Sequence, residues 1–197
     1  MICTDDAELY QQLRMLRSHG MVREASDPKL CAGYLAEYPE LNPDFIFAYP
    51  AYNVRNNELG GILGRSQLQR LDAIVARRTE NLRRFLDRID CSIYRTDFKL
   101  EGSSNYAFNL VLREPDTVFF NRLMARLREE GIEFRRGSAG GGNQLRQPYL
   151  RGIMPEGHYT NYPETEHIHF YGCYIGNFPD LADAEVDQIC EILNDVH

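Results

Sequence analysis

The sequence predicts a chain of the α/β class, in which a long helix precedes a small α+β domain of antiparallel strands flanked by helices. Residues 105–112 (NYAFNLVL) alternate between polar and apolar side chains, as a half-buried strand does. Residues 57–89 instead repeat apolar side chains every three or four positions, which is typical of an amphipathic helix. The chain therefore divides into three predicted regions: an N-terminal region at 1–56, a linking helix at 57–90 and a small C-terminal domain at 91–197.

The N-terminal region should contain one helix and then a long ordered loop. Asp5 and Glu8 have the spacing of a capping box, and leucines follow at helical intervals until Gly20. Residues 21–51 show little periodicity and contain three prolines, but the apolar residues at 45–49 favour burial. Loops of this length are usually functional or lie at an interface.

The linking helix and the small domain follow from similar signals. We expect at most one break in the helix, and we expect its arginine-rich face to be solvated. Pro115 starts a second helix that ends at Gly131. Strands are expected at 132–134 and 167–175, and a last helix at 183–196.

Composition excludes several classes of function. A net charge of −7 disfavours a nucleic-acid surface, and no apolar run is long enough to span a membrane. The five cysteines are scattered without a CxxC pair, which predicts reduced thiols and a cytoplasmic protein, and disfavours a metal or iron–sulfur site. Only two of the 22 basic residues are lysines, Lys29 and Lys99, so candidates for a Schiff base are few.

The start of the linking helix is unusual, because Gly60, Gly61 and Gly64 lie inside a helical pattern. The spacing is neither GxGxxG nor GxxxxGK[ST], and no strand precedes it, so a nucleotide-binding loop is excluded. Two interpretations remain. The glycines allow close approach to a ligand while Asn53, Arg55 and the following asparagines present donors to an anion, or the asparagines form only a structural cap.

Two further segments are rich in polar side chains. The glycine-rich run at 135–149 carries Asn143, Gln144 and Arg146, which suit a sugar phosphate or carboxylate, although an exposed hairpin loop explains the same composition. His167 and His169 would share one face of the strand predicted at 167–175. Structural roles are more typical of such a pair than metal binding.

Four motifs together resemble one enzyme family. They are MICTDDAELYQQLRMLRSHGM, AYNVRNNELGGILGRSQLQRLDAIVARR, GGNQLRQPYLRG and YTNYPETEHIHFYGCYIGNFP. The first two resemble the DegT/StrS family of sugar aminotransferases dependent on pyridoxal phosphate (PLP), and Tyr-Asn-x-Arg is the most specific element. The last two look more like the family's 3-dehydratases. These enzymes act on 4-keto-6-deoxy sugar nucleotides such as GDP-4-keto-6-deoxy-mannose.

The resemblance implies the second half of a dimeric fold-type-I enzyme, with PLP or pyridoxamine phosphate (PMP) as cofactor. In the family, the Schiff-base lysine, or the histidine that replaces it in dehydratases, lies upstream of the position of Met1. Lys29 and Lys99 lie outside that motif, so no catalytic residue is expected in this chain. Between the His-Gly and Asn-x-Arg motifs the chain has only Cys31, which disfavours the iron–sulfur cluster of some relatives.

The resemblance also implies the site residues. Asn53 would reach the phosphate of a cofactor bound by a partner subunit, with Tyr52 and Arg55 beside it. His19 would lie at the interface next to the pocket. Asn143 and Arg146 would belong to a loop that closes over the sugar nucleotide.

The expected function is therefore 3-dehydration of a sugar nucleotide in deoxysugar or O-antigen synthesis, by an enzyme of which this chain is one part. Its partners would be a nucleotide sugar and either a second copy or a complementary N-terminal half. The alternatives are a 4-aminotransferase of the same family and a non-catalytic dimerisation module from a split or truncated gene.

Overall fold

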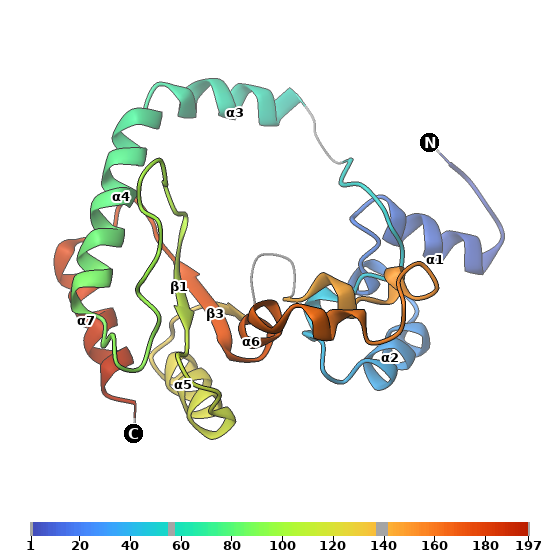
Figure 1. The fold of residues 1–197 in the computed structure, drawn as a ribbon. Helices are drawn as coiled ribbons and strands as arrows, with labels where there is room; N and C mark the ends of the chain where they lie inside the picture. Colours follow the sequence, from blue (N-terminus) through green and yellow to red (C-terminus); the bar gives the residue numbers. More distant parts are fainter. Residues whose placement is uncertain (1, 55–57, 137–141, 197) are drawn as a thin grey trace. The chain divides into compact units, whose positions relative to one another are not determined.

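The computed structural model describes residues 2–54, 58–136 and 142–196 and divides into two compact units. The first unit comprises Met1–Asn57 and Ala139–Glu166, and the second comprises Glu58–Ser138 and His167–His197. The first contains α1 (Ala7–Leu16), η1 (Val22–Glu24), α2 (Pro28–Glu37), η2 (Pro43–Phe45), η3 (Gln144–Arg146), η4 (Pro148–Leu150) and η5 (His158–Asn161). The second contains α3 (Glu58–Leu68), α4 (Leu71–Arg88), β1 (Ala107–Val111), α5 (Thr117–Glu129), β2 (Phe134–Arg136), β3 (Gly172–Gly176) and α7 (Asp183–Asn194), while α6 (Pro163–Tyr171) begins in the first unit and ends in the second (Figure 1).

The second unit is built on a three-stranded antiparallel sheet in the order β1-β3-β2. Ile175 in the central strand lies opposite Phe108 on one side and Phe134 on the other. Phe108 and Ile175 are almost fully buried, so one face of the sheet belongs to the core. The predicted small antiparallel sheet flanked by helices is confirmed.

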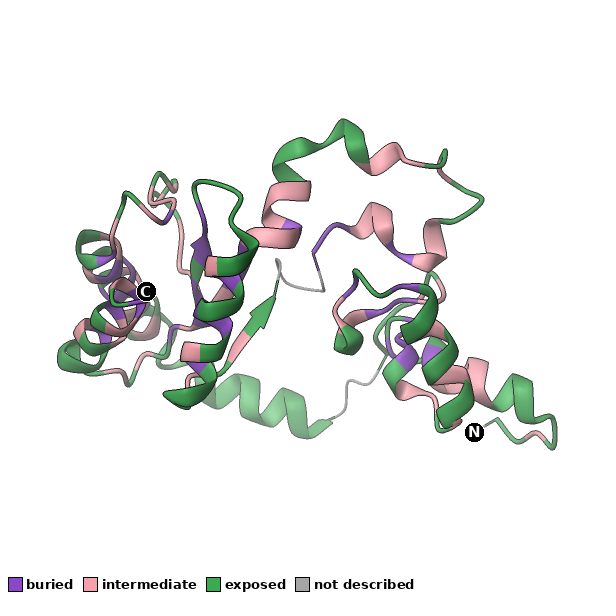
Figure 2. Ribbon diagram, turned by 90° about the horizontal axis from the view of Figure 1, so that it is seen from below, coloured by how far each residue is buried: buried purple, intermediate pink, exposed green. Residues whose placement is uncertain are grey.

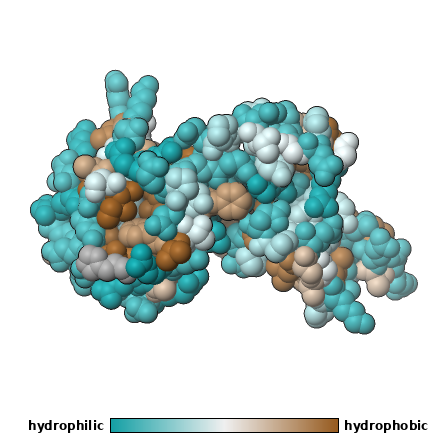
Figure 3. Space-filling model, turned by 60° about the horizontal axis from the view of Figure 1, so that its bottom comes forward, coloured by the Kyte–Doolittle hydropathy of each residue, from teal (hydrophilic) through white to brown (hydrophobic). Residues whose placement is uncertain are grey.

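The core of this unit lies where α4, α5 and α7 pack against the sheet. The ring of Phe85 from α4 stacks on Phe108 of β1, with centroids 4.4 Å apart. The buried Tyr94 hydroxyl donates to the carbonyl of Leu193 in α7 at 2.9 Å, and burial raises the pKa of Tyr94. Buried positions accordingly cluster on the strands and on the sides of helices that face them (Figure 2). The face drawn in Figure 3 is largely hydrophilic, with apolar groups in patches.

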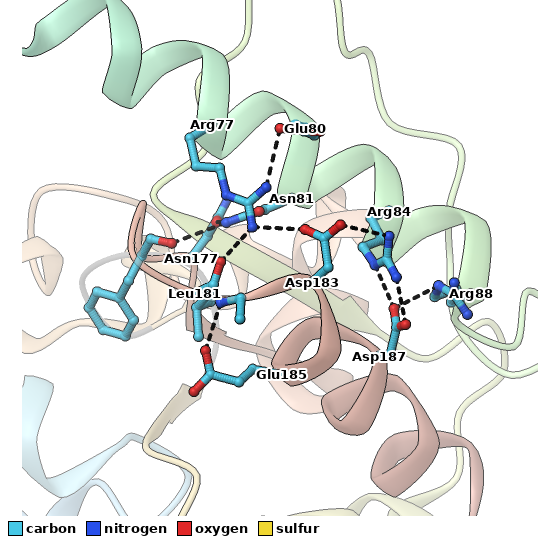
Figure 4. A network of polar contacts seen from close by, with 12 residues as sticks. Arg77, Glu80, Asn81, Arg84, Arg88, Asn177, Leu181, Asp183, Glu185 and Asp187 are labelled. Atoms are coloured by element: carbon cyan, nitrogen blue, oxygen red, sulfur yellow. Dashed lines mark hydrogen bonds and ion pairs between the residues drawn. The ribbon is translucent and has the colours of Figure 1, made fainter.

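Charged pairs join α4 to α7, which corrects the expectation of a purely solvated arginine face. Arg84 binds both carboxylate oxygens of Asp187 at 2.6 Å, and Arg88 Nε lies 2.7 Å from the same carboxylate. Arg77 donates to Asp183 at 2.9 Å and to the carbonyl of Leu181 at 2.6 Å (Figure 4). Three of the helix's arginines therefore lie at a helix–helix contact.

The first unit has its own small core, formed by Val22, Tyr38, Leu41 and Ile46. Its helix α2 falls inside the segment expected to be a loop, so that prediction was wrong for residues 28–37. Asp27 caps this helix by accepting from the backbone N–H of Lys29 at 2.9 Å, and a proline occupies the first turn. Such an N-terminus is a recognised helix start.

Three other expectations need correction. Asp6, not Asp5, caps α1 by accepting from two backbone N–H groups of the first turn. The strand expected at 132–134 is found at 134–136. The strand expected at 167–175 is helical up to Tyr171 and extended only in β3, so His167 and His169 do not share the face of a strand. The single break in the linking helix is confirmed, between Leu68 and Leu71.

Candidate functional site

A sharp turn after α1 begins the candidate site. His19 has a left-handed backbone with φ of 60°, and Gly20 follows with φ of 73°. The Gly20 N–H donates back to the carbonyl of Met15, and the His19 N–H donates to the carbonyl of Tyr52 at 3.1 Å. The turn therefore ends the helix and places His19 beside the segment that carries the Tyr-Asn motif.

Gly20 is required where the chain reverses, for two reasons. Its positive φ is unfavourable for residues with a side chain. A Cβ at this position would also lie 2.1 Å from the carbonyl oxygen of Tyr49. The close contact between the turn and Tyr49 brings the two sides of the site together.

These segments line an open aromatic pocket of about 640 Å³ within the first unit. Its walls are His19, Met21, Phe45, Phe47, Tyr49, Pro50, Ala51, Tyr52, Gln144 and Tyr149. Aromatic rings with a few polar groups at the edge are typical of sites that bind small molecules. Burial raises the pKa of Tyr149, so this phenol is a hydrogen-bond donor at neutral pH.

Gln147 connects the two chain segments that form the pocket. It is 1% exposed, and its side-chain oxygen accepts from the Phe47 N–H at 2.9 Å. Its amide nitrogen donates to the carbonyl of Phe45, also at 2.9 Å, and the Tyr149 N–H donates to the carbonyl of Phe47 at 3.2 Å. Ile46 between the two phenylalanines belongs to the core, whereas Phe45, at the end of η2, and Phe47, in the extended chain after it, line the pocket.

Asn143 and Arg146 belong to a different cluster of the same unit. Both donate to the carboxylate of Glu166, Asn143 at 2.6 Å and the Arg146 Nε at 2.9 Å. The guanidinium also lies over the ring of Tyr159, 3.9 Å from its centroid. Hydrogen bonding to Glu166 raises the pKa of Arg146, against an opposing effect of burial.

Arg146 also lines a second cavity of the first unit, of about 630 Å³. The lining includes two arginines, Arg146 and Arg151, and two glutamates, Glu40 and Glu156. Arg151 is itself paired with Glu37 at 2.5 Å. The charges of this cavity are therefore mixed.

The structure brings together only part of the predicted site. His19 and Tyr52 line the aromatic pocket, and Asn53 is bridged to Ser18 next to them. Asn143 and Arg146 do not line that pocket, and Arg55 lies outside the described residues. Pattern reasoning did not identify Phe47, Tyr149 or Gln147, although the apolar run at 45–49 was expected to be buried.

The described residues fit some of the needs of a PLP-type cofactor but not all of them. Lys29 and Lys99 are both exposed, and neither lines the pocket. The side-chain amide of Asn53 is exposed and can donate to a phosphate. The described residues therefore fit a contact to the phosphate of the cofactor, but they provide no lysine at the pocket that could form a Schiff base with it. Within these residues no group of three His, Cys, Asp or Glu side chains could hold a metal, and none of their helices is long and apolar enough to cross a membrane.

Known proteins resemble the chain over nearly all of its length. A GDP-4-keto-6-deoxy-D-mannose 3-dehydratase of Escherichia coli is 28% identical over 98% of this chain and 49% of its own length. The enzyme of the same name from Yersinia pseudotuberculosis is 28% identical over 98% of this chain and 48% of its own. A solved E. coli structure of that dehydratase, with bound hydrated PLP, is 26% identical with a TM-score of 0.61, over 96% of this chain and 48% of that one.

The chain thus spans about half the length of the curated relatives that it matches. The likeness of the solved structure confirms the fold as the corresponding part of a PLP-dependent enzyme of this type. The family model for DegT/DnrJ/EryC1/StrS aminotransferases matches residues 1–194. The chain belongs to the DegT/DnrJ/EryC1/StrS aminotransferase family.

Proposed function

We propose that the chain is the carboxyl-terminal part of a PLP- or PMP-dependent enzyme that removes the 3-hydroxyl of a 4-keto-6-deoxy sugar nucleotide, in deoxysugar or O-antigen synthesis. The observation that carries the proposal is that two curated relatives, both named GDP-4-keto-6-deoxy-D-mannose 3-dehydratase, align with 98% of the chain. The aromatic pocket supports it, because sugar rings and nucleobases pack against such side chains.

Each site residue receives a role in this proposal. Tyr52 and His19 contact the sugar nucleotide from the aromatic pocket. Asn53 donates to the cofactor phosphate held by a partner subunit or a complementary chain. Arg55, which lies outside the described residues, remains a substrate-binding candidate on the Tyr-Asn-x-Arg motif alone.

Asn143 and Arg146 receive a positioning role. Their side chains bond to Glu166, so their donors hold the segment that carries Gln144 and Tyr149 at the pocket wall. The pyridine ring of the cofactor supplies the electron sink of the reaction when it is bound. The covalent or basic group beside it comes, in this proposal, from the half of the relatives that this chain does not match.

Direct binding tests the substrate half of the proposal. We expect GDP-mannose to bind the chain more tightly than GDP, as measured by calorimetry. Tyr52→Ala should weaken GDP-mannose binding at least about tenfold, the loss of roughly 1.4 kcal/mol. Tyr10→Ala, an exposed tyrosine of α1, is the matched control and should have no effect.

Turnover tests the reaction. The chain is mixed with PMP, GDP-4-keto-6-deoxymannose and a second chain corresponding to the first half of the E. coli relative. Mass spectrometry should show a 3-deoxy sugar product. An amino sugar product instead would identify the 4-aminotransferase alternative, and binding without turnover would favour a non-catalytic module. A stoichiometric, borohydride-reducible PLP adduct on this chain alone would contradict the expectation that no residue of this chain forms a Schiff base with PLP.

A further inference from the structure

A third cavity lies within the second unit, at the end of the sheet where β2 begins. Its volume is about 600 Å³, and all of its lining residues belong to that unit. The ladder between β2 and β3 begins at Phe134 and Ile175, so it does not reach Gly176. The cavity lies where this ladder stops, and Ile189 of α7 forms part of its wall.

Most of the wall is apolar. The apolar side chains that line the cavity are Ile132, Phe134, Ile175, Phe178, Leu181 and Ile189. Ile175 is almost fully buried, and the others except Phe178 are partly buried against the core of the unit. A ligand with an apolar body is favoured here, because its binding removes water from side chains that the core leaves partly exposed.

The turn after β3 holds two sides of the cavity in place. Asn177 is fully buried, and its N–H donates to the carbonyl of Tyr106 at 2.8 Å. The side chain of Asn81 donates to the carbonyl of Phe178 at 3.1 Å. The ring of Phe178 is 62% exposed but packs against Gly176, where a Cβ would lie 2.6 Å from two ring atoms. The walls are therefore ordered without a ligand, which reduces the entropy cost of binding.

The polar part of the wall comes from the other face of the sheet. Arg135 lies opposite Tyr174 in the ladder, whereas their neighbours Phe134 and Ile175 pack against the core. The ring of Tyr106 lies edge-on to that of Tyr174, with centroids 5.9 Å apart. Interaction with Tyr174 raises the pKa of Tyr106, against an opposing effect of Arg135, so the Tyr106 hydroxyl keeps its proton at neutral pH. A guanidinium and two phenols therefore line one cavity, and all three can donate to an anion.

The guanidinium of Arg135 is only weakly paired within the chain. Its nearest carboxylate oxygen, on Glu133, lies 3.7 Å away, which is beyond hydrogen-bond distance. The two side chains are 53% and 86% exposed, so water screens their attraction. A ligand carboxylate in the cavity can replace Glu133 and accept two parallel N–H···O bonds from Arg135.

We propose that this cavity binds a small aromatic carboxylate, whose ring packs among the aromatic side chains of the wall while its carboxylate pairs with Arg135. Those aromatic side chains are Tyr106, Phe134, Tyr174 and Phe178. An anion without a ring would leave the apolar wall uncovered, and a neutral aromatic ligand would leave Arg135 without a strong partner. The cavity shares no lining residue with the aromatic pocket of the first unit, so the site does not depend on the proposed function.

Three probes of similar shape test the class of ligand. They are 3-phenylpropionate, 3-phenylpropionamide and 3-phenylpropylamine, which are negative, neutral and positive at pH 7. Titration of the 197-residue chain, followed by proton–nitrogen NMR, measures each dissociation constant and shows which backbone amides respond. We expect 3-phenylpropionate to bind with a dissociation constant of roughly 0.1–1 mM, with shifts at 131–135 and 174–178. It should bind at least about threefold more tightly than the amide, and the amine should bind most weakly.

Variants separate the charge from the apolar wall. Arg135→Gln should abolish the preference for the anion, so that 3-phenylpropionate and its amide bind within about twofold of each other. Arg136→Gln makes the same charge change at the next residue of β2, which does not line the cavity, and should keep the preference. Phe178→Ala should weaken both probes at least about threefold. Val118→Ala, which shortens a similarly exposed side chain of α5 outside the cavity, should leave both dissociation constants unchanged.

Four results would overturn the proposal. Equal affinity for the three probes would remove the role of Arg135, and tighter binding of the amine would assign charge selection to Glu133. Shifts confined to 45–52, in the aromatic pocket, or no shifts at all would show that the cavity does not take such a ligand. Binding of GDP-mannose to the first unit is measured separately, so failure of either proposal leaves the other standing.

Discussion

Gln147 holds Phe47 in the wall of the aromatic pocket through a hydrogen bond of 2.9 Å between its side-chain oxygen and the Phe47 N–H. The same amide donates to the carbonyl of Phe45, so one buried side chain satisfies backbone groups on both sides of Ile46. The contact joins residues 100 positions apart in the sequence. Gln147 therefore supplies hydrogen-bond partners to two main-chain groups of the segment that forms the pocket wall.

Replacing Gln147 should destabilise the first unit strongly. Gln147→Leu leaves the buried Phe47 N–H and the partly buried Phe45 carbonyl without their partner, which costs about 2–5 kcal/mol in the free energy of unfolding. Urea unfolding measures this change, and hydrogen exchange of peptides from 43–52 shows where protection is lost. Gln188→Leu, on the exposed side of α7, is the control and should change stability by less than about 0.5 kcal/mol.

Gln147→Glu separates the hydrogen bonds from the packing. Its carboxylate can still accept from Phe47, but the carbonyl of Phe45 then faces a negative charge. Protonation restores a donor, so the stability of this variant should recover partly as the pH falls below the pKa of the buried acid. If the variant is equally destabilised at all pH values, the hydrogen bond to the Phe45 carbonyl contributes nothing to the free energy of unfolding.

Two glycines of the first unit should respond oppositely to alanine. Gly20→Ala adds a Cβ at positive φ, 2.1 Å from the Tyr49 carbonyl, and should cost more than about 2 kcal/mol. Gly33→Ala lies in α2, where the Cβ would meet no described atom within 4 Å, and should stabilise by about 0.5–1 kcal/mol. Thermal unfolding of both variants compares them, and a neutral Gly20→Ala would contradict the close contact between the turn and Tyr49.

Local periodicity predicted most of the second unit. The alternation at 105–112 and the apolar stripe of the linking helix depend on neighbouring residues, and both elements formed where expected. The prediction was wrong where two signals competed. HIHFY alternates like a strand, but Pro163 and the acidic residues after it start a helix that continues through these residues. Helix α2 was missed because no residue in it is buried, so its apolar pattern is weak.

The candidate site was predicted less completely, because long-range contacts form it. The resemblance to a family identified His19 and Tyr52, and the His19 N–H does bond to the Tyr52 carbonyl. No local pattern relates Gln147 to Phe47, since a hydrogen bond across 100 residues depends on the fold. Arg146 was expected to face a ligand because of its charge and because of the family resemblance, whereas in the structure Glu166 accepts its hydrogen bonds.

Replacing the Asn177 side chain by a charged one should lower the free energy of unfolding of the second unit. It is fully buried, and its amide nitrogen donates to the carbonyls of Arg78 and Asn105, both at 2.9 Å. Asn177→Asp places a carboxylate against two carbonyls and should cost about 3–5 kcal/mol at pH 7, with partial recovery in acid. Asn109→Asp makes the same change at an exposed position of β1 and should cost less than about 0.5 kcal/mol. Urea unfolding compares the pair, and equal effects would contradict the role of Asn177.

The contact between Arg84 and Asp187 predicts a pH dependence of the α4–α7 contact. Hydrogen bonds from Arg84 lower the pKa of the Asp187 carboxyl. A carboxyl with a lowered pKa in the folded state contributes stability above its unfolded pKa, about 3.9 for aspartate, and loses it as the pH falls through the folded value. Asp187→Asn should therefore lower the unfolding temperature at pH 7, and the difference from the unmodified protein should shrink below about pH 4. Asp180→Asn, an exposed aspartate, is the control, and a difference that stays constant down to about pH 2 would contradict the charge contribution of Asp187.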